Sequence, residues 1–207
     1  MLLPPWIDSA IYLKFEGESY RDIEMLTVAN QLTLLRMLLI PALVILIVYG
    51  LNGWALVVFV VAGITDALDG ILARWWGQRT KLGAFLDPMA DKLLLISVFI
   101  VLTSPSLDLP NRFPIWLTVL VISRDVIIVL TVAIVNLSIG RRSFQPTMLG
   151  KVSTFVYIVT VAAAMYFNWL GKSSVVFDIG VYATLTLTLV SGLHYIAHAS
   201  RVLNSAP

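Results

Sequence analysis

The chain has 207 residues, of which 59% are hydrophobic and only 13% are charged. A soluble domain carries about 25% charged residues, so this composition predicts a protein whose solvent is lipid. The formal net charge of +2 and the absence of cysteine argue against nucleic-acid binding, a disulfide framework and thiolate chemistry. We therefore expect an integral membrane protein that contacts lipids and no nucleic acid.

Six apolar segments are long enough to cross a bilayer. They cover residues 32–49, 54–72, 85–102, 115–137, 152–169 and 175–197, with turn-forming residues between them. The sequence therefore predicts an all-α membrane protein with six transmembrane helices in one domain, residues 32–207. Residues 1–31 form a separate N-terminal segment, and between positions 20 and 31 it places Ile23, Leu26 and Val28 among the charged residues Arg21, Asp22 and Glu24. This pattern predicts a helix lying in the membrane interface, and a solvated leader is the alternative.

The distribution of Lys and Arg predicts the orientation of the chain. Nine of these residues lie in the N-terminal segment, the second and fourth loops and the C-terminal tail, whereas only Arg112 and Lys172 lie in the other loops. Both termini and the loop between the second and third spans are therefore expected in the cytoplasm.

Four aspartates stand close together in this apolar chain, as the pairs Asp66 and Asp69 and Asp87 and Asp91. The members of each pair are three or four residues apart, so they share one face of a helix. A short loop makes the two helices antiparallel neighbours, so both pairs can converge at one membrane depth. Adjacent carboxylates in lipid repel one another and are costly. Cations with oxygen ligands compensate them most simply, which predicts Mg²⁺ or Mn²⁺.

Small residues line the same helix at Gly63, Ala67, Gly70 and Ala73. They allow close helix packing, or room for a nucleotide against the backbone, and both can hold. Arg74 follows one turn after Gly70, where it can pair with a diphosphate or serve as an ordinary topology determinant.

The run Asp66-x-x-Asp69-Gly70-x-x-Ala73-Arg74, followed after eight residues by Gly83-x-x-x-Asp87-x-x-x-Asp91, resembles the signature of the CDP-alcohol phosphotransferase family. The resemblance extends from about Asn30 onward. It implies a two-metal site, a CDP-linked donor such as CDP-diacylglycerol, an alcohol acceptor and a homodimer. A bacterial inner membrane with the active site facing the cytoplasm is the expected location.

The resemblance also implies residue roles. Asp66, Asp69 and Asp87 match metal ligands, and Asp91 matches the general base that also contributes to the metal site. The positions that receive the CDP donor are matched by five residues: Asp69, Gly70, Ala73, Arg74 and Gly83.

The choice of acceptor is open. Asn30-x-x-Thr33-x-x-Arg36 resembles a segment of phosphatidylglycerol-phosphate and cardiolipin synthases, which implies that Thr33 serves the donor and that Asn30 and Arg36 serve the acceptor. A helix cap and interfacial anchor is the alternative. Further candidates for an anionic acceptor are Lys92, Arg124, Asp125, Arg141, Arg142 and Lys151, and an internal ion pair or the topology rule would also explain them.

Two details favour phosphatidylglycerol as the acceptor, as in cardiolipin synthases, over glycerol-3-phosphate. Arg124-Asp125 stands where phosphatidylglycerol-phosphate synthases usually carry Arg-Glu, and Val132 replaces their second Arg. The run Pro146-Thr147-x-x-Gly150-Lys151-x-x-Thr154 resembles cardiolipin synthases.

Two other protein classes use intramembrane carboxylates. Membrane prenyltransferases place their Asp motifs far apart in sequence, whereas these motifs are adjacent. A cation transporter would spread carboxylates through the membrane or show inverted repeats. His194 and His198 are four residues apart without a third ligand nearby, so interface polarity explains them better than a metal site.

Overall fold

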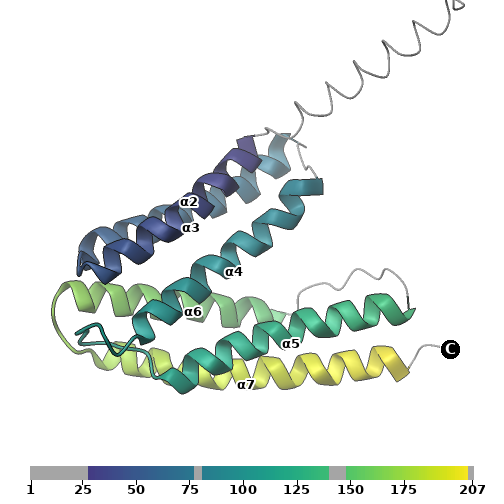
Figure 1. The fold of residues 1–207 in the computed structure, drawn as a ribbon. Helices are drawn as coiled ribbons and strands as arrows, with labels where there is room; N and C mark the ends of the chain where they lie inside the picture. The colour runs from purple at the N-terminus through teal and green to yellow at the C-terminus, as the bar shows by residue number, and fades with distance from the viewer. Residues whose placement is uncertain (1–27, 77–80, 140–147, 205–207) are drawn as a thin grey trace, which may run out of the picture. The chain divides into compact units, whose positions relative to one another are not determined.

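The computed structural model describes the backbone of residues 28–76, 81–139 and 148–204, and the side chains of 31–66, 89–131 and 148–197. Within these ranges all regular structure is helical, in six helices without a strand. They are α2 (Val28–Val48), α3 (Asn52–Trp76), α4 (Lys81–Thr103), α5 (Ile115–Ile139), α6 (Met148–Trp169) and α7 (Val175–Asn204) (Figure 1). Each predicted apolar segment falls on one helix, which confirms the all-α class.

Within the described residues, three of these helices contain a window long and apolar enough to cross a membrane. They are α2 over Gln31–Val48, α6 over Met148–Trp169 and α7 over Val175–Ala197. The prediction of six crossings and the predicted orientation of the termini therefore stay predictions. The expected interfacial helix lies outside the described residues as far as position 27, and its last residues form the start of α2.

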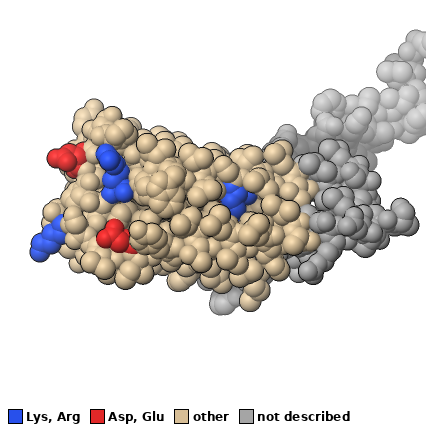
Figure 2. All heavy atoms as spheres, turned by 90° about the horizontal axis from the view of Figure 1, so that it is seen from below, with Lys and Arg blue, Asp and Glu red and all other residues tan. Residues whose placement is uncertain are grey.

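Large apolar side chains remain exposed along the helices, among them Leu38 on α2, Val129 on α5, Phe155 on α6 and Ile179 on α7. The face shown in Figure 2 carries few charged side chains where it is described, and most of them gather toward one end. Water would not tolerate such a surface around a monomer, whereas hydrocarbon chains solvate it well. The exposed surface therefore agrees with the composition in requiring lipid.

Two helices end in the same glycine cap. Gly50 after α2 and Gly171 after α6 have positive φ angles of 73° and 65°. The next residue in each case donates its backbone N–H five residues back, from Leu51 to the Leu46 carbonyl at 2.8 Å and from Lys172 to the Phe167 carbonyl at 3.1 Å. Because glycine adopts this left-handed conformation at little cost, both turns end their helices where the sequence placed the loops.

The chain divides into two compact units. The first comprises Met1–Pro41 and Val61–Leu94, and the second comprises Ala42–Val60 and Leu95–Pro207. In the second unit α7 packs against both α5 and α6 (Figure 1). Aromatic rings fill part of its core: the Phe99 and Phe113 centroids are 4.7 Å apart, and those of Phe113 and Phe177 are 5.1 Å apart.

Hydroxyl groups join α6 to α7 in this unit. The Tyr157 hydroxyl lies 2.6 Å from the Thr188 hydroxyl, and those of Thr160 and Thr184 are 3.3 Å apart. Thr160 and Thr188 also donate to carbonyls four residues earlier in their own helices. Because apolar burial gives little drive for association in lipid, such cross-helix hydrogen bonds and close packing hold the helices together.

The helices α6 and α7 pack closely at Gly180. A Cβ atom there would lie 2.7 Å from Cγ2 of Thr160. Thr160 is β-branched and hydrogen bonded, so its side chain cannot easily move away. Glycine at this position lets the two helices approach each other.

A pair of buried asparagines fastens the loop between α4 and α5 to the turn between α6 and α7. Asn111 donates its backbone N–H to Oδ1 of Asn168 at 2.8 Å, and Asn168 donates Nδ2 to the Asn111 carbonyl at 3.1 Å. The Asn111 side chain also donates to the Lys172 carbonyl at 2.7 Å and accepts from the Ser174 N–H at 2.9 Å. This network satisfies backbone groups of two turns that would otherwise be buried without partners.

Replacing Asn111 with Ala should lower the free energy of unfolding by about 1–3 kcal/mol, because the Lys172 carbonyl and the Ser174 N–H lose their partner. Unfolding in detergent micelles would measure the loss. Arg112→Ala changes the exposed neighbour and is the control, with an expected change within about 0.5 kcal/mol. Equal stability of Asn111→Ala and the parent would contradict a stabilising role for the network.

Candidate active site

One guanidinium in the first unit joins both aspartate motifs. Nη1 of Arg36, on α2, lies 3.0 Å from Oδ1 of Asp66 on α3 and 2.7 Å from Oδ1 of Asp91 on α4. Both distances are those of charge-assisted hydrogen bonds. The prediction that the two motifs can converge is confirmed for one residue of each pair, Asp66 and Asp91.

The three side chains differ in exposure. Arg36 is 1% exposed, whereas Asp66 and Asp91 are 46% and 43% exposed. The cation is therefore enclosed by protein, while both carboxylates keep open surface. Carboxylates held in this way have oxygen atoms available to a ligand from outside.

The other members of the motif are placed by their backbone alone. Asp69, Gly70, Ala73 and Arg74 lie in the last part of α3, and Gly83 and Asp87 lie in the first part of α4. Each aspartate pair thus lies within one helix, as the spacing predicted. The side chains of these six residues lie outside the described ones. Among the described side chains there is no group of three or more His, Asp or Glu residues that could hold a metal ion.

Two polar residues near the start of α2, Thr33 and Arg36, lie on the same side of the helix. Thr33 is fully buried, as is Arg36 one turn later. Asn30 lies in the first turn, and its side chain is outside the described ones. The predicted ligand roles of Asn30, Thr33 and Arg36 stay predictions.

The charged pair within α5 is an internal ion pair with a third partner. Nη1 of Arg124 lies 2.8 Å from Oδ1 of Asp125, and Nε donates to the Ser191 hydroxyl of α7 at 3.2 Å. Both charged residues are buried. Gly192 lies beside this contact, since a Cβ there would be 3.7 Å from Cγ of Arg124. The pair therefore holds α5 to α7, and this contact does not depend on any ligand.

The remaining cationic candidates are only partly described. Lys92 on α4 is half-buried and Lys151 on α6 is exposed, while Arg141 and Arg142 lie outside the described residues. His194 on α7 is exposed, and the side chain of His198 is outside the described ones. The predicted acceptor site is therefore not assembled by the described residues alone.

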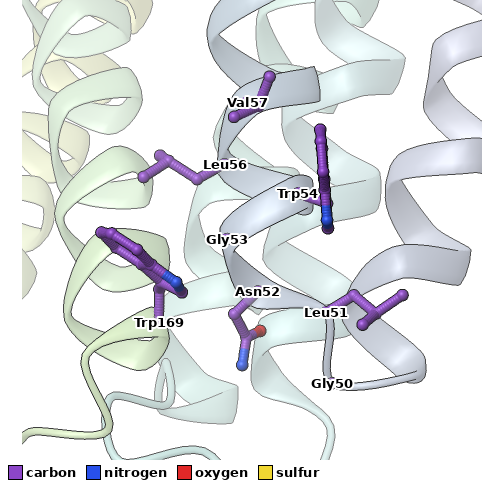
Figure 3. A pocket seen from close by; sticks show the side chains of 8 residues that line it. All are labelled: Gly50, Leu51, Asn52, Gly53, Trp54, Leu56, Val57 and Trp169. Carbon is purple, nitrogen blue, oxygen red and sulfur yellow. The ribbon is translucent and has the colours of Figure 1, made fainter.

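A pocket of about 500 Å³ opens in the second unit, between the start of α3 and the end of α6. Figure 3 shows the Trp169 side chain beside Gly53, with Asn52 and Leu56 nearby and Trp54 on the other side of α3. Gly53 is needed for this approach, because a Cβ there would lie 2.7 Å from the indole Nε1. The lining is apolar apart from Asn52 and the indole nitrogen and carries no charge, so it offers nothing for phosphoryl chemistry.

The sequence pattern of one protein family, described as CDP-alcohol phosphatidyltransferase, matches residues 26–193. A probable phosphatidylglycerophosphate synthase of Mycobacterium tuberculosis is 35% identical over 84% of this chain and 81% of its own length. A CMP-forming cardiolipin synthase of Homo sapiens is 37% identical over 67% of this chain and 50% of its own length. A CMP-forming cardiolipin synthase of Streptomyces coelicolor is 35% identical over 63% of this chain and 61% of its own length.

The chain belongs to the CDP-alcohol phosphatidyltransferase family. It is therefore a transferase of a membrane-protein family whose similar members include enzymes of phospholipid synthesis. The family match also favours phosphatidyl transfer over the prenyltransferase and cation-transport interpretations.

Proposed function

We propose that the chain transfers a phosphatidyl group from CDP-diacylglycerol to the hydroxyl of an alcohol and releases CMP, at a site formed by Asp66, Asp69, Asp87 and Asp91. The observation that carries the proposal is the meeting of Asp66 and Asp91, from two helices, at one guanidinium within a family member. The open surface of both carboxylates leaves them able to take part in phosphoryl chemistry.

The described part of the site fits a divalent cation. Its carboxylate oxygens are the hard ligands that Mg²⁺ and Mn²⁺ prefer, and Asp66 and Asp91 are nearly half exposed beside the Arg36 guanidinium. Asp66, Asp69 and Asp87 would hold the metal, and Asp91 would contribute to the same site. When bound, the metal neutralises the charge of the donor diphosphate and of the leaving phosphate.

The chain itself supplies a base and a donor site. Asp91 accepts the proton of the acceptor hydroxyl, the acceptor oxygen forms a bond to the β-phosphorus of the donor, and the bond to the CMP oxygen breaks. Gly70, Ala73 and Gly83 leave room for the nucleotide beside the helix backbone, Arg74 pairs with its phosphates, and Thr33 supports the donor from α2. No covalent enzyme intermediate is required.

The Lys and Arg distribution supports a cytoplasmic active site, and the family resemblance supports a homodimer. We infer six membrane crossings, both termini and the active site on the cytoplasmic side, an interfacial helix before α2 and a homodimer in a bacterial inner membrane. Support comes from three helices with apolar windows of 18 to 23 residues and from exposed apolar side chains on the others.

The acceptor is proposed to be phosphatidylglycerol, which makes the enzyme a cardiolipin synthase. Similar proteins carry both names, so the alternative acceptor glycerol-3-phosphate keeps support from a phosphatidylglycerophosphate synthase that matches 84% of this chain. Arg141, Arg142 and Lys151 are proposed to bind the acceptor phosphate, and Asn30, Lys92, Arg124 and Asp125 are proposed as further acceptor residues. Two bonds already hold the Arg124 guanidinium in place, so it would present a pre-oriented charge.

Removing the metal or one of its ligands should abolish turnover. Asp66→Ala, Asp69→Ala and Asp87→Ala each lose an oxygen ligand, and chelation with EDTA should give the same loss, reversed by added Mg²⁺ or Mn²⁺. Release of CMP measures the effect. Asp108→Ala is the control, because Asp108 is an exposed aspartate in the loop between α4 and α5. Near-normal turnover in EDTA would rule out the metal.

Replacing Asp91 with Asn should lower turnover by about 10²–10⁴-fold while the affinity for CDP-diacylglycerol survives, because the amide keeps the size of the side chain but cannot accept the proton. The measurement is donor affinity by direct binding beside the rate of CMP release. If turnover is retained, another group is the base.

Neutralising Arg141 and Arg142 together should weaken acceptor affinity about ten- to hundred-fold for each charge-assisted hydrogen bond that is removed, and donor affinity should stay almost unchanged. The matched control is Arg112→Gln with Lys172→Gln, two exposed cations of the other loops. The same assay compares acceptors. Release of CMP with glycerol-3-phosphate and not with phosphatidylglycerol would exclude the cardiolipin assignment and leave phosphatidyl transfer intact.

A further inference from the structure

We propose that Arg36 is a positioning residue of this enzyme: through its contact with Asp91 it fixes the orientation of that carboxylate toward the acceptor hydroxyl. The proposal rests on the proposed function in one respect, the role of Asp91 as base. It adds a third helix, α2, to the two that carry the aspartate motifs.

The geometry of the contact shows how Arg36 can act on Asp91. One nitrogen, Nη1, is bonded to Oδ1 of Asp91 at 2.7 Å and to Oδ1 of Asp66 at 3.0 Å. A carboxylate bound through one oxygen no longer rotates freely about its Cβ–Cγ bond, so the direction of its second oxygen is set as well. Because general-base catalysis needs an oxygen within hydrogen-bond reach of the hydroxyl, this restriction affects the rate directly.

The burial of Arg36 favours a positioning role over direct contact with the acceptor. The Arg36 side chain is 1% exposed, and the two carboxylates to which it is bonded keep more than two fifths of their surface open. A ligand from outside therefore meets the carboxylates and not the guanidinium. Thr33, one turn earlier on the same side of α2, is also fully buried, so this side of the helix faces protein. We therefore assign Arg36 to the support of Asp91.

The same contact distinguishes Lys from Gln as a replacement. Where Arg binds with two nitrogens, Lys is a poor substitute. The contacts with Asp66 and Asp91 both use Nη1, so a single ammonium group at that place can reach both carboxylates. Gln keeps much of the volume but has no charge. Rescue by Lys and not by Gln is therefore expected.

The experiment compares Arg36→Gln, Arg36→Lys and the control Arg112→Gln in the full-length protein, with phosphatidylglycerol and glycerol-3-phosphate as acceptors. It measures kcat, the acceptor KM, CDP-diacylglycerol affinity by direct binding, and the melting temperature. Arg36→Gln should lower kcat about ten- to hundred-fold, with acceptor KM and donor affinity changed less than about threefold. Arg36→Lys should recover at least half of the lost activity on a logarithmic scale, and Arg112→Gln should match the parent.

A double-mutant cycle tests whether Arg36 acts through Asp91. Adding Arg36→Gln to Asp91→Asn should lower the residual kcat less than about threefold, because the group that Arg36 positions is already disabled. A further ten- to hundred-fold loss in that background would overturn the proposal while leaving Asp91 as the base. Full turnover of Asp91→Asn alone would instead remove the base assignment and the proposal with it.

Other outcomes also decide against positioning. A rise in acceptor KM at unchanged kcat would make Arg36 an acceptor ligand. Loss of donor affinity and of the melting transition in both Arg36→Gln and Arg36→Lys would give it a purely structural role.

Discussion

The structure of the proposed active site depends on charge compensation inside an apolar chain. Carboxylates on neighbouring helices repel one another, and in a medium of low dielectric constant that repulsion is strong. The buried guanidinium of Arg36 forms ion pairs with both Asp66 and Asp91. The same contact that makes the carboxylates tolerable also brings α2, α3 and α4 together around them.

In the second unit, few charged groups take part in holding the helices together. Its one described buried ion pair, Arg124 with Asp125, is completed by the Ser191 hydroxyl. Elsewhere its buried polar groups are hydroxyls and asparagine amides, which bond across helices and to carbonyls of their own helix. Such bonds let helices associate in lipid, where apolar contacts alone give little preference for protein over hydrocarbon.

Neutral hydrogen bonds and a compensated carboxylate site serve different purposes in this chain. Neutral hydrogen bonds and close contacts at glycines hold helices together without leaving open polar surface. The site around Asp66 and Asp91 does the opposite, since both carboxylates stay nearly half exposed beside a cation that is enclosed. An open, partly compensated group of carboxylates costs stability and is retained where it serves a reaction. Membership of a transferase family agrees with that interpretation.

The sequence by itself determined the all-helical class, the position of every described helix, the two aspartate pairs and the family. These features are local: apolar length, glycine at helix ends and fixed spacings within one helix, all of which survive without knowledge of packing. The resemblance of its segment placed Arg36 at the acceptor. Its true partners could not be foreseen, because a spacing of three residues says nothing about which side chains lie across the bundle. Only the tertiary structure decided that its guanidinium bonds to Asp66 and Asp91, far along the chain, and that Arg124 reaches Ser191 on α7. Such contacts depend on how helices pack against one another, which local patterns do not encode.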